Sequence, residues 1–272
     1  MTTSSPSTRH SPDLPEALVD ALSQVHRLVV FSGSGMSAES GIPTFRDAMH
    51  GLWAQFDPSA LASPEGWKED RARVWAWYEW RRGLVMRAKP HAGHLAIPQL
   101  AHALSRFTGH EVLVDVVTQN VDDLHERAGA TDVQHLHGSL FAPRCGACGK
   151  PGEFAGLPPL EPVDRLVPPR CQHCQGFLRP GVVWFGESLP MGVWHQAESL
   201  IASCDVLLVV GTSGVVYPAA GLPASARRAG KWVAEINPTA SELSSQVNLH
   251  WQTTAAQGLG SLLKALTERG TA

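Results

Sequence analysis

This sequence has no long apolar run and no strong excess of positive over negative charge or the reverse. No apolar stretch approaches the ~20 residues of a transmembrane helix, so we expect no membrane contact. The opening residues, MTTSSPSTRHSPD, lack the apolar core of a secretory signal, and residues 1–12 are predicted to be a disordered tail because they are rich in Ser, Thr and Pro. The formal net charge of −3 gives no basic surface for nucleic acid. We therefore expect a cytoplasmic protein without nucleic-acid partners, and we also expect it to be a monomer.

Short apolar runs alternate with segments of helical periodicity along most of the 272 residues, and no internal repeat is present. Strands are predicted at 27–31, 112–118, 133–136, 206–210, 232–236 and 247–251. Helices are predicted at 15–25, 92–106, 193–203, 221–229 and 258–268. This alternation predicts an α/β fold whose parallel sheet is covered by helices on both faces.

Four of the five cysteines form two CxxC pairs, Cys145 with Cys148 and Cys171 with Cys174. Two such pairs at this separation are typical of a tetrahedral four-cysteine zinc site. The alternative is a pair of disulfides in a secreted protein, which the missing signal sequence disfavours. Because sulfur would fill all four positions, the zinc is predicted to be structural. The fifth cysteine, Cys204, precedes an apolar strand and is predicted to be a buried core thiol.

A glycine-rich turn, Gly33-Ser-Gly-Met-Ser-Ala38, follows the first predicted strand and leads into a helix. Glycines in such a turn let the backbone approach a pyrophosphate, although many matches to this short pattern are ordinary turns. A dehydrogenase would also carry an acidic residue at the end of a second strand about 20 residues later, to bind the ribose. None closes a strand near Asp57. The sequence therefore predicts a nucleotide site without the usual arrangement for hydride transfer.

Two stretches interrupt the alternation of strands and helices. Residues 47–90 are rich in Trp and Arg and look helical in their second half, and residues 138–182 carry the paired cysteines. We predict that these two stretches form a small helical and zinc-binding domain inserted into a Rossmann-like domain and packed on its edge. The Rossmann-like domain would comprise residues 13–46, 91–137 and 183–272.

Six motifs occur together in a fixed order. They are GSGMSAESGIPTFR at 33–46, TQNVD at 118–122, HLHGS at 135–139, the paired CxxC motifs, GTS at 211–213 and EINP at 235–238. The motifs and their order resemble those of the sirtuin family, and the resemblance extends over residues 27 to 266. Ser34 and Met36 depart from the family's usual Ala and Ile, and both changes leave the phosphate turn plausible.

The resemblance implies an NAD-dependent protein-lysine deacylase that consumes NAD, releases nicotinamide and leaves the acyl group on ADP-ribose. His137 matches the family's catalytic base, and Asn120 and Asp122 would act beside it. Imidazole suits this role because it titrates near neutral pH. His135 is the rival candidate, and the Gly that follows His137 in the family motif selects His137.

The resemblance also assigns residues to NAD. These are Gly33, Ser34, Gly35, Ser37, Pro43, Thr44, Phe45, Arg46, Trp53, Gln119, Asn120, Asp122, His137, Gly211, Thr212, Ser213, Asn237, Pro238 and Gly258. Several follow predicted strands, at the sheet edge where open α/β folds bind ligands. Asn120 and Asp122 also suit a helix N-cap, and the two roles are compatible.

The acyl-lysine of a protein substrate would lie between two segments that resemble the family's peptide-pairing edges. The contacts expected there are Val183, Phe185, Gly186, Glu187, Val215 and Val216. Tyr78 and Arg81 are spaced i, i+3 on one helix face and resemble the pair found in sirtuins that accept succinyl- and malonyl-lysine. The alternative for Arg81 is a surface side chain packed over Trp77 or Trp80.

Three other functions share part of these features. A nicotinamide-dependent oxidoreductase would share the glycine turn, and a zinc-ribbon protein that binds nucleic acid would share the cysteines. Within the family, a protein mono-ADP-ribosyltransferase is the nearest alternative.

Overall fold

The computed structural model describes residues 13–44, 56–57 and 61–270. The predicted NAD contacts Phe45, Arg46 and Trp53 lie outside these residues. Of the helices within them, none combines the length and the apolar character that crossing a membrane requires.

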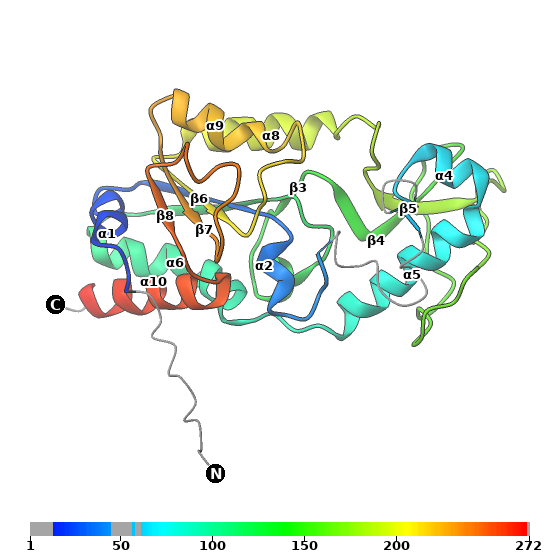
Figure 1. Cartoon of the computed structure of the whole chain (residues 1–272), viewed down its shortest axis with the longest axis horizontal. Helices are drawn as coiled ribbons and strands as arrows, with labels where there is room; N and C mark the ends of the chain where they lie inside the picture. The colour runs from blue at the N-terminus through cyan, green and yellow to red at the C-terminus, as the bar shows by residue number, and fades with distance from the viewer. Residues whose placement is uncertain (1–12, 45–55, 58–60, 271–272) are drawn as a thin grey trace, which may run out of the picture.

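A six-stranded parallel sheet forms the larger part of the molecule (Figure 1), in the order β3-β2-β1-β6-β7-β8. Its strands are β1 (Arg27–Ser32), β2 (Leu113–Thr118), β3 (Gln134–His135), β6 (Val206–Val210), β7 (Trp232–Ile236) and β8 (Leu249–Trp251). All six predicted strands are confirmed. Because the strand order reverses between β1 and β6, a crevice is expected at the carboxyl ends of these two strands.

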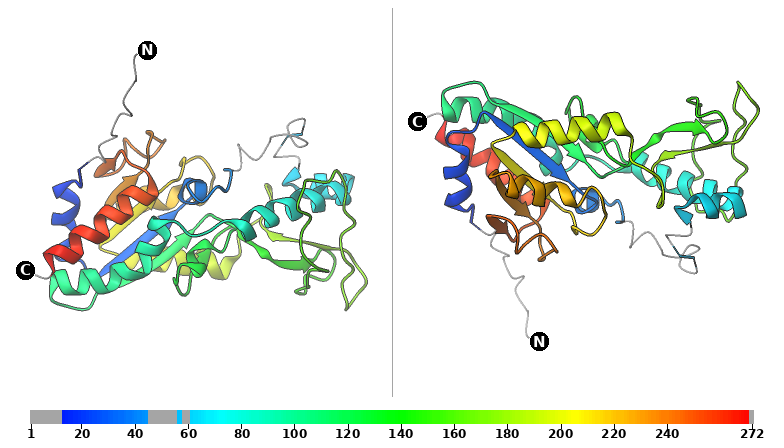
Figure 2. Two further views of the ribbon diagram at one scale, coloured as in Figure 1. Left: turned by 90° about the horizontal axis from the view of Figure 1, so that it is seen from below. Right: turned by 90° about the horizontal axis from the view of Figure 1, so that it is seen from above.

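Helices cover both faces of the sheet, as predicted (Figure 2). One layer contains α1 (Glu16–Leu22), α6 (Ala92–Thr108) and α10 (Ala255–Arg269), and the other contains α8 (Met191–Ser203) and α9 (Gly221–Arg228). The helix α10 begins three residues before the predicted start at 258, because the Thr254 hydroxyl accepts a hydrogen bond from the Gln257 amide and caps it.

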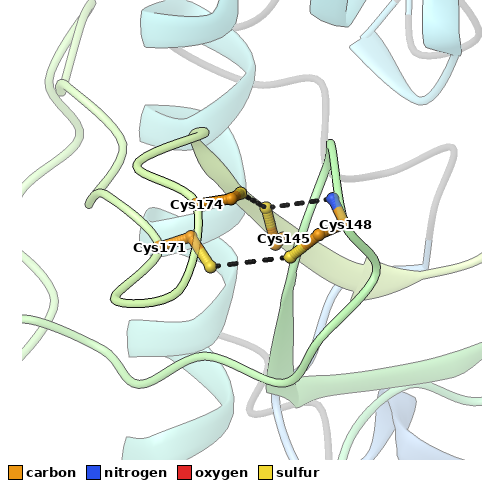
Figure 3. Close-up of side chains that lie close together, drawn as sticks. All are labelled: Cys145, Cys148, Cys171 and Cys174. Carbon is orange, nitrogen blue, oxygen red and sulfur yellow. Dashed lines mark hydrogen bonds between the residues drawn. The ribbon is translucent and has the colours of Figure 1, made fainter.

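The remaining elements form a small domain beside the sheet. They are α4 (Pro64–Glu69), α5 (Arg71–Arg87) and an antiparallel pair, β4 (Gly138–Cys145) and β5 (Leu178–Val182). Their shared core is rich in tryptophan and includes Trp67, Trp75, Trp77 and Trp184. The four paired cysteines gather at the end of β4 (Figure 3). In the small domain the long helix α5 packs on the antiparallel pair β4–β5, which we call the hairpin of the small domain.

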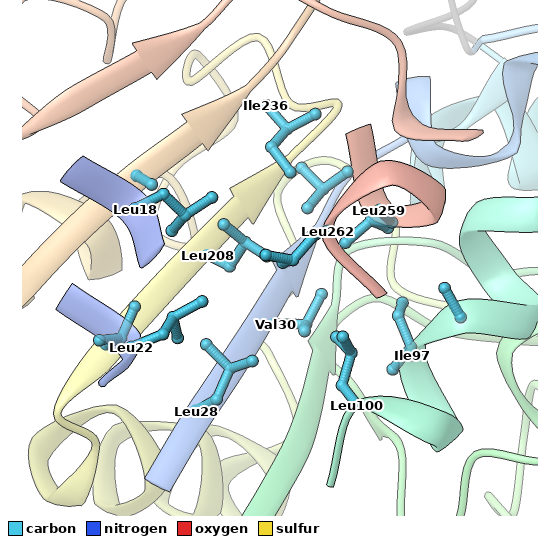
Figure 4. Packing of buried hydrophobic residues seen from close by; sticks show 14 of the residues in the cluster. Leu18, Leu22, Leu28, Val30, Ile97, Leu100, Leu208, Ile236, Leu259 and Leu262 are labelled. Atoms are coloured by element: carbon cyan, nitrogen blue, oxygen red, sulfur yellow. The ribbon is translucent and has the colours of Figure 1, made fainter. Parts of the chain in front are cut away.

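The strands of the large sheet alternate their side chains between two separate apolar clusters. Along β1, Leu28 and Val30 face α1, α6 and α10, whereas Val29 and Phe31 face α8 and α9. Figure 4 shows the first cluster, in which Leu18 and Ile97 come from two of the covering helices. Both clusters are buried, so the sheet is a rigid support for the loops at its carboxyl edge.

Candidate active site

The turns after β1 and β6 touch each other at the carboxyl edge of the sheet. The Gly35 amide donates to the Gly211 carbonyl at 2.8 Å, and a Cβ at position 211 would lie 2.3 Å from the Met36 nitrogen. Gly211 also has a φ of +61°, which side chains with a Cβ rarely adopt. Glycine is therefore required where β1 passes through the glycine-rich turn into the short helix α2 (Gly35–Ala38). This contact forms the floor of the expected nucleotide crevice.

A cavity of about 260 Å³ opens above this contact and is lined by residues of both domains. Most of the predicted site residues line it. They are Gly33, Ser34, Ser37, Pro43, Tyr78, Arg81, Gln119, Asn120, Asp122, His137, Val183, Phe185, Gly186, Glu187, Thr212, Ser213 and Val216. Residues from four of the six family motifs, at 33–46, 118–122, 135–139 and 211–213, thus meet in one cavity with Tyr78, Arg81 and the segment 183–187.

A buried polar group occupies the sheet-domain side of the cavity. Asp122 Oδ2 accepts a hydrogen bond from Ser37 Oγ at 2.9 Å, and Asn120 Nδ2 donates to the same hydroxyl at 3.1 Å. Asp122 Oδ1 also accepts from the amide of Leu124, the first residue of α7 (Leu124–Arg127), but the N-cap of this helix is Asp123, so the N-cap role predicted for Asn120 and Asp122 is wrong. Burial raises the pKa of Asp122, against the lowering effect of these hydrogen bonds.

His137 has a fixed orientation at the cavity wall. Its Nδ1–H donates to the Gln119 carbonyl at 2.9 Å, so the neutral ring carries its lone pair on Nε2. Burial lowers the pKa of His137, and the Gln119 hydrogen bond offsets this only in part. The imidazole is therefore neutral at pH 7 and can accept a proton at Nε2.

His135, the rival candidate, has both ring nitrogens engaged. Nδ1 contacts the Asn120 carbonyl at 2.9 Å and Nε2 contacts Glu126 Oε1 at 2.6 Å. Burial alone would lower its pKa, but the bonds to Glu126 and Asn120 outweigh it and the pKa is raised. His135 is also not among the residues that line the cavity. Its contacts suit a structural role.

Tyr78 and Arg81 lie on the small-domain side of the same cavity, on α5. The Arg81 guanidinium carbon is 5.0 Å from the Trp77 ring centroid and 5.8 Å from that of Tyr78. Packing over Trp77, the alternative role for Arg81, is thus observed together with a place at the cavity. The indole Nε1–H of Trp184 donates to the Tyr78 hydroxyl at 3.1 Å.

The paired cysteines fit a zinc ion. Their four Sγ atoms all lie within 4.8 Å of one another, with Cys145 and Cys174 at 3.4 Å and Cys148 and Cys171 at 3.8 Å. Disulfides would need sulfur atoms ~2.05 Å apart, whereas tetrahedral zinc with bonds of ~2.3 Å places them at distances like these. The site holds a structural zinc, and the disulfide alternative is wrong. Cys204 is buried as predicted, and burial raises its pKa to about 11.

Comparisons with known proteins agree with this geometry. Residues 33–218 match the profile of the family described as the Sir2 family. The sequence is 48% identical over 254 residues to an NAD-dependent protein deacylase of Corynebacterium glutamicum, covering 93% of this chain and 96% of the relative. The chain belongs to the Sir2 family. The sirtuin resemblance is thereby confirmed. Another relative, NAD-dependent protein deacylase 1 of Pseudomonas aeruginosa, is 51% identical over 224 residues, which cover 82% of this chain and 87% of that protein.

Solved Sir2 structures share the fold over nearly the whole chain. A Sir2 homolog–NAD complex superposes with a TM-score of 0.83 at 40% identity, covering 96% of both chains. A mutant Sir2 homologue in complex with 2′-O-acetyl ADP ribose also has a TM-score of 0.83, at 38% identity, covering 95% of this chain and 99% of the other. The fold of this chain is thus shared with Sir2 proteins whose structures contain NAD or 2′-O-acetyl ADP ribose.

Several predicted site residues of this Sir2 protein lie outside the cavity lining. They are the predicted NAD contacts Gly35, Thr44, Gly211, Asn237, Pro238 and Gly258 and the predicted peptide contact Val215. Asn237 Nδ2 donates to the Thr212 carbonyl at 3.0 Å and so supports a residue that does line the cavity. A Cβ on Gly258 would lie 2.8 Å from Thr253 Cγ2, so this glycine lets α10 pack closely on its neighbours.

The sequence analysis missed part of the cavity wall. Leu84 and Val85 follow Arg81 by three and four residues, and helical spacing alone would have placed them on the same face. Trp184 lies in a segment that was singled out, but its contact with Tyr78 spans 106 positions and had no local signal.

Proposed function

We propose that this Sir2 protein is an NAD-dependent protein deacylase that moves an acyl group from a lysine side chain to ADP-ribose and releases nicotinamide. The names of its relatives and the NAD and 2′-O-acetyl ADP ribose complexes of its structural neighbours support this. The observation that carries the proposal is His137, held as a neutral base at a cavity shared by the nucleotide crevice and the small domain.

The residues of the cavity are suited to hold NAD. When bound, NAD would supply a ribose carbon open to attack and a leaving nicotinamide. The touching turns at Gly35 and Gly211 give the pyrophosphate close access to the backbone. In this proposal Thr212, supported by Asn237, would contact the adenosine half, and Asn120 and Asp122 would contact the nicotinamide end.

His137 would act on a ribose hydroxyl. Its Nε2 takes the hydroxyl proton, and the Gln119 carbonyl on Nδ1–H stabilises the imidazolium that results. The walls nearby include Ile42, Val121 and Leu140, whose apolar side chains keep water from the reacting carbon.

A lysine-bearing peptide would enter between the segments 183–187 and 214–217. The amides of Val183, Trp184, Phe185 and Glu187 already donate within the chain. The first segment therefore offers a peptide mainly carbonyl acceptors, and the main-chain pairing would tolerate many sequences. A solved Sir2 complex with a p53 peptide and NAD+, at 25% identity and a TM-score of 0.74, supports a peptide substrate.

The direct test is a panel of acyl-lysine peptides incubated with NAD and followed by mass spectrometry. We expect equal amounts of free nicotinamide, deacylated peptide and O-acyl-ADP-ribose. Formation of NADH, seen by its absorbance, would instead indicate an oxidoreductase. ADP-ribose bound covalently to protein, without deacylated peptide, would indicate an ADP-ribosyltransferase.

We further propose that the acyl groups accepted include succinyl and malonyl. Tyr78 and Arg81 project from one face of α5 to the cavity that also contains His137. A guanidinium can bind a carboxylate through two hydrogen bonds, and a phenol can add a third. Acetyl-lysine has no such carboxylate, so it would be accepted without using the pair.

A further inference from the structure

A continuous series of contacts connects Tyr78 with Trp184, Arg179 and Glu187. Arg179 donates two hydrogen bonds to Glu187, at 2.5 and 2.8 Å. The Arg179 guanidinium carbon lies 3.3 Å from the ring centroid of Trp184, whose Nε1–H donates to the Tyr78 hydroxyl. Arg179, Trp184 and Tyr78 are only 8%, 2% and 4% exposed. The series is thus buried and held at both ends.

The direction of the Trp184–Tyr78 hydrogen bond determines where the hydroxyl hydrogen of Tyr78 can point. An indole N–H can only donate, so the Tyr78 oxygen is the acceptor and its own O–H must find another partner. In the described part of the chain, no group accepts a hydrogen bond from this hydroxyl. Tyr78 lines the cavity, and Arg81 follows it by one turn of α5. A buried donor needs an acceptor, and the neighbouring guanidinium favours an anionic one, which a substrate can supply.

We propose that Trp184 is the positioning residue for acyl selectivity, because it turns the Tyr78 O–H toward an acyl carboxylate bound beside Arg81. The Arg179–Glu187 pair in turn holds the indole ring, and Glu187 Oε2 also accepts from the Trp184 amide at 2.9 Å. This inference rests on the proposed deacylase function. It adds a specificity residue that never touches the acyl carboxylate.

The phenol stays available as a donor over the whole working range of pH. Burial raises the pKa of Tyr78 to about 12, although Arg81 and the Trp184 hydrogen bond act in the opposite direction. A neutral, oriented phenol loses less rotational freedom on binding than a free one does. The oriented Tyr78 hydroxyl therefore favours binding only of acyl groups that place a hydrogen-bond acceptor beside it.

The test compares wild type with Trp184→Phe, Tyr78→Phe and the double variant. Phenylalanine keeps a ring beneath Arg179 and removes the N–H donor together with part of the bulk of the indole, a loss of bulk that the Trp75→Phe control shares. We expect the ratio of kcat/KM for succinyl- over acetyl-lysine peptide to fall roughly tenfold in Trp184→Phe, mainly through KM for the succinyl peptide. In the Tyr78→Phe background the same change should reduce the ratio no further, because the hydroxyl is already absent.

Trp75→Phe is the matched control. Trp75 is a buried tryptophan of the same core that packs 6.0 Å from the Phe154 ring and does not line the cavity. Its replacement should leave the ratio unchanged. If Trp184→Phe does not fold, Arg179→Lys, which loses the paired bonds to Glu187, should still lower the ratio by a few-fold, and an unchanged ratio would overturn the inference.

Equal losses for both peptides in Trp184→Phe, adding fully to those of Tyr78→Phe, would show that Trp184 only packs the core and would overturn the inference. A wild-type enzyme that deacetylates but does not desuccinylate would also overturn it while leaving the deacylase function intact. A wild-type enzyme that releases no nicotinamide from either peptide would overturn both.

Discussion

The two walls of the active-site cavity are built in different ways. The sheet-domain wall consists of turns whose main chains touch, at Gly35 and Gly211, and of polar side chains such as Ser37 and Asp122 that bond to one another. The small-domain wall is carried by a tryptophan-rich helix and a hairpin whose far end is closed by four cysteines. On the proposed function, the first wall would carry chemistry that every acyl group needs, whereas the second would distinguish among acyl groups and is closed by the zinc site.

The largest expected effect is loss of the zinc site. Cys145→Ala should release the metal and lower the free energy of unfolding by several kcal/mol, because metal binding and local folding are coupled. Activity should be lost only as a consequence. Zinc content by elemental analysis and thermal unfolding measure this. Cys204→Ala, in the core of the sheet domain, is the control and should cost only the ~1 kcal/mol of an ordinary substitution. Fully active protein without zinc would contradict the prediction.

Next in size is the loss of the base on the other wall. His137→Ala should lower kcat about 10²–10⁴-fold for all acyl groups, with the melting temperature and NAD affinity nearly unchanged. His135→Ala is the comparison variant, because its ring is held by Asn120 and Glu126. The pH profile adds a second criterion. Since burial lowers the pKa of His137, activity should persist until the pH falls below ~6.5, whereas a base with the raised pKa of His135 would lose activity above that value.

A smaller and more selective effect is expected from substitutions in the small-domain wall. Arg81→Met should lower kcat/KM for succinyl-lysine peptide by an amount equal to about 2–5 kcal/mol. The reason is that the substrate carboxylate in a partly dry pocket is left without its cation. Tyr78→Phe should act in the same direction but more mildly. Acetyl-lysine turnover should change little. The control is Arg87→Met, an exposed arginine on the same helix. Matched kcat/KM values that fall in parallel for all acyl groups would refute the role of the pair.

The last prediction concerns the acid sensitivity of the sheet domain. Burial lowers the pKa of His94 to about 2 and that of His125 to about 4, so both are neutral in the folded protein. The unfolded chain takes up these protons below pH ~6.5, so the stability they contribute is complete above that pH and is lost as the pH falls toward 4 and below. We expect each of the two histidines to lower the free energy of unfolding by about 1–2 kcal/mol between pH 6.5 and 5.

Denaturant unfolding at several pH values tests this prediction. His94→Phe should flatten the pH dependence because one buried titrating group is removed. His102→Gln, at an exposed position of the same helix, should leave it unchanged. A wild-type stability that stays constant from pH 7 to 5 would refute the prediction.

The sequence predicted most of the sheet domain because each buried parallel strand is a short apolar run, as Val206–Val210 shows. The hairpin of the small domain was not predicted as strands. Its segments contain Pro143, Pro180 and Gly181, and lack the alternation that identifies an exposed strand. Such a pair is stabilised by the metal and by α5, and not by its own pattern.

For the site, motifs identified His137 but could not supply its tautomer, which depends on a carbonyl 18 positions away. The orientation of Tyr78 depends on a still more distant partner, Trp184. Contacts of this kind arise from the packing of two domains and leave no periodic pattern in the sequence.

The interrupted chain path of the small domain fixes the order in which it can assemble. Its helix α5 is synthesised before the sheet strands β2 and β3, and its hairpin and cysteines only afterwards. Until then Trp75 and Trp77 have no partner hairpin to cover them, so an apolar surface is exposed on the growing chain. Zinc can be captured only once Cys174 has been made, before β6, β7 and β8 of the sheet domain are synthesised. The nucleotide crevice, which needs the contact between Gly35 and Gly211, is therefore completed only after every segment of the small domain has been made.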